Sequence, residues 1–264
     1  MLPSDSQGTS RLSRFNLMQS VFAEGLIVVA LVAWWLGSLV LPSYAFPGPG
    51  EVFLAMGRLL VDPDFAVHSF ATASRILIAI VFAMLIGGGL AMLPRYVPEF
   101  GVFVNERVRP IMNSFPSIGW AILGSIWFGV SWTAVIFVQT AILIPFTMIN
   151  ISEGLREISS EEQEMARSFT RNKWRAFSLV IFPMLFPYLV TAVRISYGVA
   201  WKISLVAELF GARIGLGTLI LQSQTNNRID IVFAVCLMIV VFFILGEKLV
   251  LAPLARLYRA PQRI

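Results

Sequence analysis

Three charged residues lie in one long apolar run and are the side chains best placed to act on a solute. Arg194, Lys202 and Glu208 fall inside residues 176–210, a run that we predict to cross a membrane. A charged side chain near the centre of a bilayer costs roughly 3 kcal/mol to insert, so these residues are not expected to face lipid. Charges along a water-filled path attract or repel a charged solute. We therefore predict Arg194, Lys202 and Glu208 as candidate residues of a translocation path.

Each of these residues also has a structural alternative. Arg194 lies near mid-span and would serve equally well as a bridge within a helix bundle, and Glu208, near the outer end, could be a surface residue or a contact for an external protein. Lys202 has no acidic residue three or four positions away, and Glu106 or Glu208 from another helix or subunit could pair with it. Within one helix, Lys202 and Glu208 lie about 120° apart and are not natural partners.

Catalytic and cofactor chemistry finds little support in the sequence. The chain has one cysteine, Cys236, and one histidine, His68, so neither a disulfide framework nor a histidine-rich metal cluster is available. It contains no GxSxG nucleophile motif and no GxxxxGK[ST] phosphate-binding loop. We predict that the chain is not an enzyme, has no catalytic residue and binds no metal or cofactor itself.

A polar segment between two apolar runs is the second candidate site. Residues 161–187 read EEQEMARSFTRNKWRAFSLVIFPMLFP, and the flanking runs 131–152 and 176–193 carry no charged residue. The segment should therefore lie at a membrane surface. We predict a short amphipathic helix over 155–170, with Ser159–Ser160 and the following glutamates favouring a helix start. Its apolar positions are Leu155, Ile158, Met165, Ala166 and Phe169.

This segment resembles the "EAA" signature of ABC importer membrane subunits. Glu164, Met165 and Ala166 stand at Glu-Ala-Ala, and Val180 to Pro183 stand at Ile-x-Leu-Pro with the same spacing. Thr170 replaces the glycine of the signature, and glycine would allow a left-handed turn more readily than threonine. The resemblance implies that loop 153–173 is a cytoplasmic coupling helix docking on an ATPase subunit. The implied coupling residues are Glu164, Met165, Ala166, Thr170 and Pro183.

Composition and apolar runs define the elements that hold these residues. With 57% hydrophobic and 13% charged residues, the chain belongs to the membrane class. We predict an all-α, polytopic integral membrane protein with six transmembrane helices and a cytoplasmic coupling helix. The spans are residues 21–41, 66–93, 111–130 with an interruption at Pro116, 131–152, 176–210 and 231–251. Gly87, Gly88 and Gly89 in the second span would allow another helix to approach closely.

The distribution of basic residues predicts the orientation. With six spans, fourteen of the 20 Lys and Arg residues fall on one side, three on the other, and Arg75, Arg194 and Lys202 within spans. Cytoplasmic loops carry the excess of Lys and Arg, so both termini and the coupling loop should be cytoplasmic. The predicted domains are a cytoplasmic tail over 1–20, a permease domain over 21–255 and a second cytoplasmic tail over 256–264.

The resemblance extends from about residue 47 to residue 251 and is closest to nitrate/sulfonate/taurine-type permeases of bacterial inner membranes. The stretches that carry it include Ser74-Arg75, Phe115-Pro116-Ser117, Trp127-Phe128-Gly129 and Gly215-Leu216-Gly217. It implies a permease dimer, two ATPase subunits that hold ATP and magnesium, an external solute-binding protein, and a small, anionic solute. We expect the dimer to pair two copies of this chain, with a dimer of two different permeases as the alternative. Nucleic acid is not an expected partner, because the basic residues gather at span ends.

One alternative comes from a different class: a secondary transporter or membrane scaffold without an ATPase. It would be recognised by inverted repeats with discontinuous helices in both halves, and the sequence has no convincing repeat.

Overall fold

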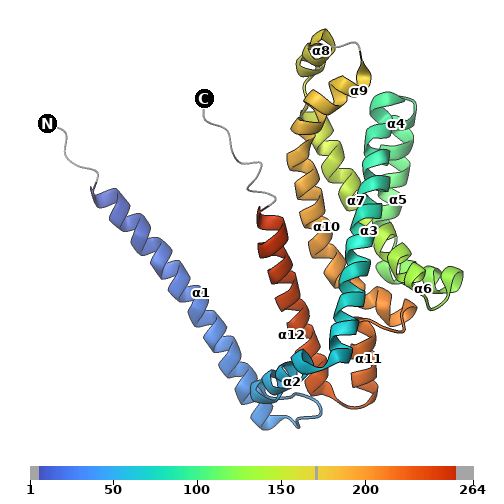
Figure 1. Ribbon diagram of the computed structural model, residues 1–264. Coiled ribbons are helices and arrows are strands. Elements are labelled where there is room, and N and C mark those ends of the chain that lie inside the picture. The colour runs from blue at the N-terminus through green and yellow to red at the C-terminus, as the bar shows by residue number, and fades with distance from the viewer. Residues whose placement is uncertain (1–5, 170–171, 254–264) are drawn as a thin grey trace.

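The computed structural model describes residues 6–169 and 172–253, which are helical and contain no β-strand (Figure 1). Among these residues, four stretches are long and apolar enough to cross a membrane: Pro63–Tyr96, Trp132–Glu157, Trp174–Gly211 and Ile229–Leu251. Two shorter apolar helices, Glu24–Val40 and Ser117–Phe128, fall in the first and third predicted spans. The all-α, polytopic membrane fold is thus confirmed, with four of the six predicted spans present at spanning length.

The first helices in chain order are α1 (Ser6–Val40), α2 (Pro49–Val61), α3 (Pro63–Tyr96), α4 (Phe100–Val102), α5 (Arg109–Ser114), α6 (Ser117–Phe128) and α7 (Trp132–Glu157). They are followed by α8 (Ser160–Phe169), α9 (Lys173–Ala176), α10 (Phe182–Gly211), α11 (Leu216–Thr225) and α12 (Ile229–Gly246). The described residues also form three π-helical segments: η1 (Phe103–Val108) joins α4 to α5, η2 (Phe177–Ile181) joins α9 to α10, and η3 (Glu247–Leu251) follows α12.

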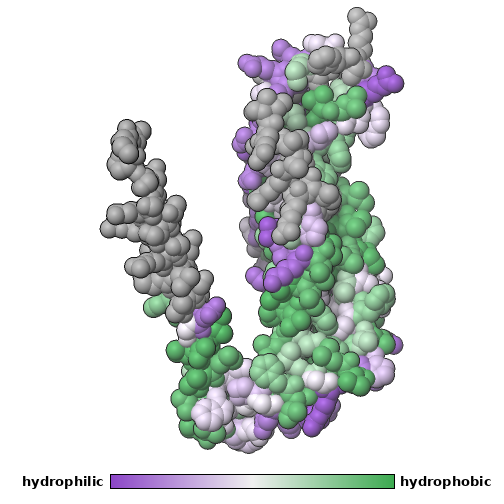
Figure 2. Space-filling model, turned by 60° about the vertical axis from the view of Figure 1, so that its left-hand side comes forward, coloured by the Kyte–Doolittle hydropathy of each residue, from purple (hydrophilic) through white to green (hydrophobic). Residues whose placement is uncertain are grey.

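The body of the molecule is a bundle in which α7 packs between α3 and α10 (Figure 1). The helix α8 lies at one end of this bundle, and α2 and α11 lie at the other; we call them the α8 end and the α11 end. Hydrophobic side chains cover much of the body between its two ends, and hydrophilic ones gather at the ends and in a patch at mid-height (Figure 2). This distribution fits a bilayer core between two polar surfaces.

A glycine allows the close approach of α3 and α7. A Cβ atom added to Gly87 would collide with Thr147 Oγ1 and lie 2.8 Å from the carbonyl oxygen of Ile144. The Thr147 hydroxyl donates across this contact to the carbonyl of Ala83 at 2.9 Å. Gly89, two residues later, has no such neighbour within 4 Å. The predicted close packing is therefore confirmed at Gly87.

The first helix departs from the prediction. Residues 6–20 of the predicted tail and residues 21–40 of the predicted first span form one continuous helix, so the helix does not begin at the predicted boundary. Propagating an existing helix costs far less than nucleating one, and the apolar half extends into the polar residues before it. Figure 1 shows α1 diverging from the body towards Ser6. The predicted tail over 256–264 lies outside the described residues.

Prolines explain the broken and widened helices. Pro116 is in an extended conformation between α5 and α6, which confirms the predicted interruption. A further proline stands two residues after the last residue of each π-helical segment: Pro110, Pro183 and Pro253. A helical proline lacks the N–H that would bond the carbonyl four residues earlier, and its ring pushes that carbonyl away. In all three cases that carbonyl lies inside the π segment, which accounts for its wider turn.

We expect Gly87→Ala to destabilise the fold by about 1–3 kcal/mol, because the added methyl group overpacks the contact with Thr147. The thermal unfolding temperature of the purified protein in detergent measures the effect. Gly89→Ala is the matched control, since it adds the same methyl group to the same helix in open space. Equal unfolding temperatures for the two variants would contradict the packing described for Gly87.

Candidate coupling segment and translocation site

The helix α8 begins with a capping box. The Ser159 backbone N–H donates to Glu162 Oε2 at 2.8 Å, and the Glu162 N–H donates to Ser159 Oγ at 3.2 Å. This reciprocal pair satisfies two N–H groups that a helix start leaves without partners. The helix start favoured by the serines is confirmed, but the single helix predicted over 155–170 is wrong. Leu155 belongs to the end of α7 and is buried there, so α8 starts at Ser160.

The predicted coupling residues fall in three places. Glu164 and Met165 are exposed on α8, and Ala166 lies in the same helix. Thr170 lies outside the described residues. Pro183 is exposed in the first turn of α10, directly after the wide turn of η2. The α8 helix projects beyond the ends of α7 and α10, so Glu164 and Met165 can reach a partner protein (Figure 1).

One face of α10 is exposed along its length. At 100° per residue, its members fall within an arc of about 60°. They are Thr191, Ile195, Gly198, Lys202 and Leu209, and each is exposed or half-buried. We call this face the α10 stripe. Among the described residues, no carboxylate forms an ion pair with Lys202. The stripe thus presents one ammonium group on an otherwise apolar and weakly polar surface.

Arg194 lies beside the stripe and pairs with the last helix. Its guanidinium forms an ion pair with the carboxylate of Glu247, the first residue of η3. The Arg194 side chain is 58% exposed and that of Glu247 19% exposed, so this pair lies at the surface of the chain. The structural alternative considered for Arg194, a bridge within the bundle, corresponds to this contact.

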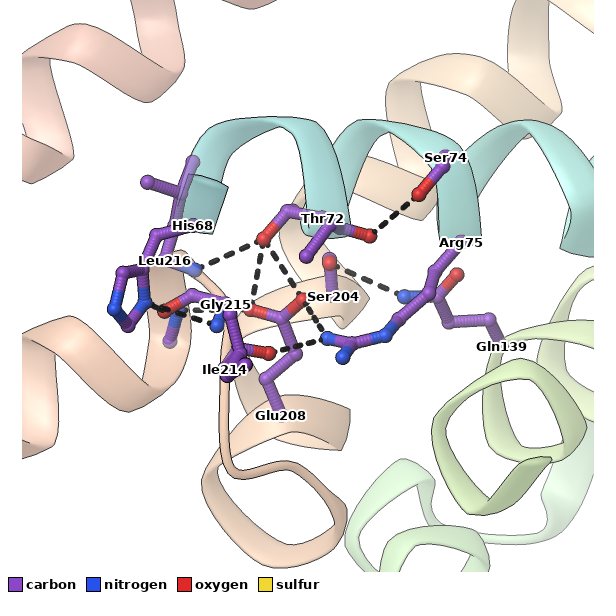
Figure 3. Close-up of polar contacts among 12 residues, drawn as sticks. His68, Thr72, Ser74, Arg75, Gln139, Ser204, Glu208, Ile214, Gly215 and Leu216 are labelled. Carbon is purple, nitrogen blue, oxygen red and sulfur yellow. Dashed lines mark hydrogen bonds and ion pairs between the residues drawn. The ribbon is translucent and has the colours of Figure 1, made fainter. Parts of the chain in front are cut away.

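Glu208 is fully buried and holds three elements together (Figure 3). Its carboxylate accepts from Arg75 Nη1 at 2.9 Å and from Thr72 Oγ1 at 2.8 Å, both on α3. It also accepts from the N–H of Gly217 in α11 at 2.9 Å. Glu208 is therefore not a surface residue of this chain, and its partner is Arg75 rather than Lys202. Its carboxylate points away from the α10 stripe, as the 120° between Lys202 and Glu208 predicted.

Two glycines let the chain fold tightly around Glu208. Gly215 has a φ of +152°, and a Cβ atom there would collide with the Glu208 carboxylate. At Gly217, a Cβ atom would lie 2.9 Å from Glu208 Cβ and 2.8 Å from the carbonyl oxygen of Leu205. The Gly215 N–H also donates to His68 Nδ1 at 3.0 Å. The turn between α10 and α11 is thus closed over a buried carboxylate.

Sequence reasoning missed the partners of Glu208. Arg75 is 1% exposed, donates through Nη1 to the carbonyl of Ile214 at 2.7 Å, and lies 4.4 Å from the ring centre of Trp132. Thr72 and His68 come from the same side of α3 (Figure 3). The available signal was charge balance: Arg75 and Glu208 are opposite charges, each near the outer end of a predicted span.

The α11 end carries a polar hollow of about 290 Å³, lined in part by Glu51, Arg58 and Asp230. Beside it, Arg228 donates to both carboxylate oxygens of Asp230, at 3.0 and 2.9 Å. These hydrogen bonds to Asp230 raise the pKa of the Arg228 guanidinium above its ordinary value. The hollow lies between α2 and the turn before α12.

Comparison with known proteins gives a consistent result. The family described as "binding-protein-dependent transport system inner membrane component" matches residues 99–252. The taurine transport system permease protein of Escherichia coli (strain K12) is 27% identical over 227 residues, covering 82% of this chain and 81% of that protein. A putative aliphatic sulfonates transport permease protein of Bacillus subtilis (strain 168) is 25% identical, covering 85% and 81%. The nitrate import permease protein of Synechocystis (strain PCC 6803) is 22% identical, covering 70% of each.

We expect Ser159→Ala to loosen α8, because the first turn loses a side-chain cap worth about 1 kcal/mol. Amide hydrogen exchange over residues 160–169 should become roughly fivefold faster. Ser168→Ala is the control: its hydroxyl donates to the Glu164 carbonyl within the helix and caps no terminus. If exchange in α8 is equally fast in both variants, the capping box does not stabilise this helix.

Proposed function

The chain belongs to the family of binding-protein-dependent transport system inner membrane components, and from this membership we propose how its residues carry out transport. It is a membrane-spanning permease subunit of an ATP-driven ABC importer of the nitrate/sulfonate/taurine type. It is not an enzyme, because ATP hydrolysis in such importers belongs to a separate ATPase subunit. The family match over residues 99–252, which contains α8, α10 and α11, is the observation that carries this conclusion.

Helix α8 is our proposed contact with the ATPase subunit. The Ser159 capping box gives the helix a fixed start, and its exposed Glu164 and Met165 provide one charged and one apolar contact. A short rigid helix transmits movement between subunits better than a flexible loop. Residues 153–173 would thus convert closure of the ATPase subunits into movement of α7 and α10, which flank α8 in the chain.

The α8 end is the proposed cytoplasmic side. This orientation places the majority of the Lys and Arg residues in the cytoplasm. The α11 end then faces outwards, and its polar hollow, with Glu51, Arg58 and Asp230, is available to the external binding protein. The Ser6 end of α1 and the Leu251 end of η3 both lie towards the α8 side, which supports cytoplasmic termini (Figure 1).

The α10 stripe is the proposed wall of the translocation path, completed by a second permease copy. An exposed ammonium facing lipid would be unfavourable, whereas two Lys202 side chains facing one aqueous path would give it a positive potential. The relatives are named for taurine, aliphatic sulfonates and nitrate, and all three solutes carry a sulfonate or oxyanion group. We infer a small anionic solute, a dimer of identical permeases and two ATPase subunits.

Glu164→Lys should uncouple ATP hydrolysis from transport. Reversing the charge removes a charge-assisted contact worth about 1.5–3 kcal/mol, so solute-stimulated hydrolysis should fall roughly tenfold. The rate is measured for the purified complex in lipid vesicles. Glu99→Lys is the control, since it makes the same charge change at another exposed site of the α8 end. Equal stimulation in both variants would mean that Glu164 is merely solvated.

Lys202→Met should reduce uptake without reducing assembly. Loss of the ammonium weakens attraction of an anion by about 1.5–3 kcal/mol, so uptake of radiolabelled taurine or nitrate into vesicles should fall roughly tenfold. Lys202→Arg keeps the positive charge and should retain most of the uptake. If Lys202→Met prevents assembly and a charge swap with Glu106 restores it, the lysine is a structural partner and not a path residue.

A further inference from the structure

The buried Arg75–Glu208 pair has a role beyond neutralising charge. We propose that Glu208 is a positioning residue that couples the external surface on α11 to α10, the helix that carries Lys202. This proposal rests on the proposed function, since it assigns to the importer the route by which the binding protein acts on the permease. It follows from how α11 begins, what surrounds the carboxylate, and what α11 exposes.

Helix α11 is capped from outside itself. Its N-cap residue is Gly215, which has no side chain to satisfy the first N–H groups. The Leu216 N–H instead donates to Thr72 Oγ1 at 2.9 Å, and the Gly217 N–H donates to Glu208 Oε2 at 2.9 Å. A carboxylate at a helix N-terminus also interacts favourably with the helix dipole. The start of α11 is therefore held by α3 and by α10 together.

The contact between Glu208 and the start of α11 is too close for α10 and α11 to slide past each other. The Glu208 carboxylate is fully buried, and Gly215 and Gly217 approach it so closely that a methyl group would not fit at either position. Arg75 closes the other side, donating to Glu208 Oε1 at 2.9 Å and to the Ile214 carbonyl at 2.7 Å. Movement of the α11 start must therefore move the last turns of α10, or else break several buried hydrogen bonds.

The C-terminal end of α11 is exposed to solvent. Gln222, Gln224 and Thr225 are exposed, and so are Asn226 to Arg228 in the following turn. A protein that docks at the α11 end would thus meet polar side chains at one end of α11, while Glu208 holds its other end. Lys202 lies six residues before Glu208 on α10, less than two helical turns away.

A buried ion pair is better suited to fixing the relative position of α10 and α11 than to stabilising the fold. Buried ion pairs are often no more stabilising than well-packed apolar residues of similar size, but they accept only a narrow range of geometries. A junction that must keep α11 and α10 in one relative position needs that geometric restriction.

The test compares two double variants in the assembled complex with its ATPase in lipid vesicles. Arg75→Met with Glu208→Met removes both charges and leaves neither stranded. Gln139→Met with Ser204→Ala is the control. It removes a buried polar contact of 3.1 Å between α7 and α10, one turn before Glu208, which does not involve α11. The readout is the ratio of ATP hydrolysis with and without the binding protein, loaded with taurine or nitrate.

We expect this ratio to fall at least fivefold in the Arg75/Glu208 variant and to change less than twofold in the control. An unchanged ratio in the Arg75/Glu208 variant, or an equal loss in the control, overturns the proposal.

If the Arg75/Glu208 variant does not assemble, Thr72→Val replaces it, because this substitution removes the hydrogen-bond acceptor of the Leu216 N–H without leaving an unpaired charge. Its ratio must then fall at least twofold, and an unchanged ratio overturns the proposal. The wild-type complex must itself respond to the binding protein; lack of any response would instead contradict the proposed function.

Discussion

A charge surrounded by hydrocarbon needs a partner within reach, and this requirement organises much of the molecule. Arg75 and Glu208 meet it by mutual pairing with almost no exposure, and Arg194 and Glu247 meet it at the protomer surface. Among the described residues, Lys202 forms no such pair. Arg75 is thus paired in the interior, Arg194 is paired at the surface, and Lys202 has no ion-pair partner among the described residues.

The two ends of the bundle differ in how their backbone groups are held. At the α11 end, Glu208 and Thr72 hold the first two N–H groups of α11, and Gly215 and Gly217 let the backbone close around them. Towards the α8 end, proline-linked π-helical segments interrupt regular hydrogen bonding, as before Pro183. On the proposed function, movement at α8 would reach α10 through the wide turn of η2, whereas the α11 end should move as a unit.

Features fixed by neighbouring residues were predictable from the sequence, and features fixed by helix rotation were not. The start of α8 depends on Ser159 and Glu162, three residues apart, and was predicted from that local pattern. Its separation from α7 was missed, because the apolar spacing continues through Leu155 into a different helix. Arg75 and Glu208 are 133 residues apart, so pairing them requires the relative rotation of α3 and α10. The motif at Glu164 indicated the family, but it did not indicate which residues form hydrogen bonds with Glu208.

The near-independence of α1 has a consequence for how the protein is made. Near the C-terminal end of α1, Trp34 Nε1 donates to the Pro47 carbonyl at 3.0 Å and the Trp34 ring stacks on Phe233. Phe233 belongs to α12, which the ribosome completes long after α1. A nascent α1 can thus enter the membrane before its aromatic contact with α12 exists. The stacking of Trp34 on Phe233 forms only after α12 has been made.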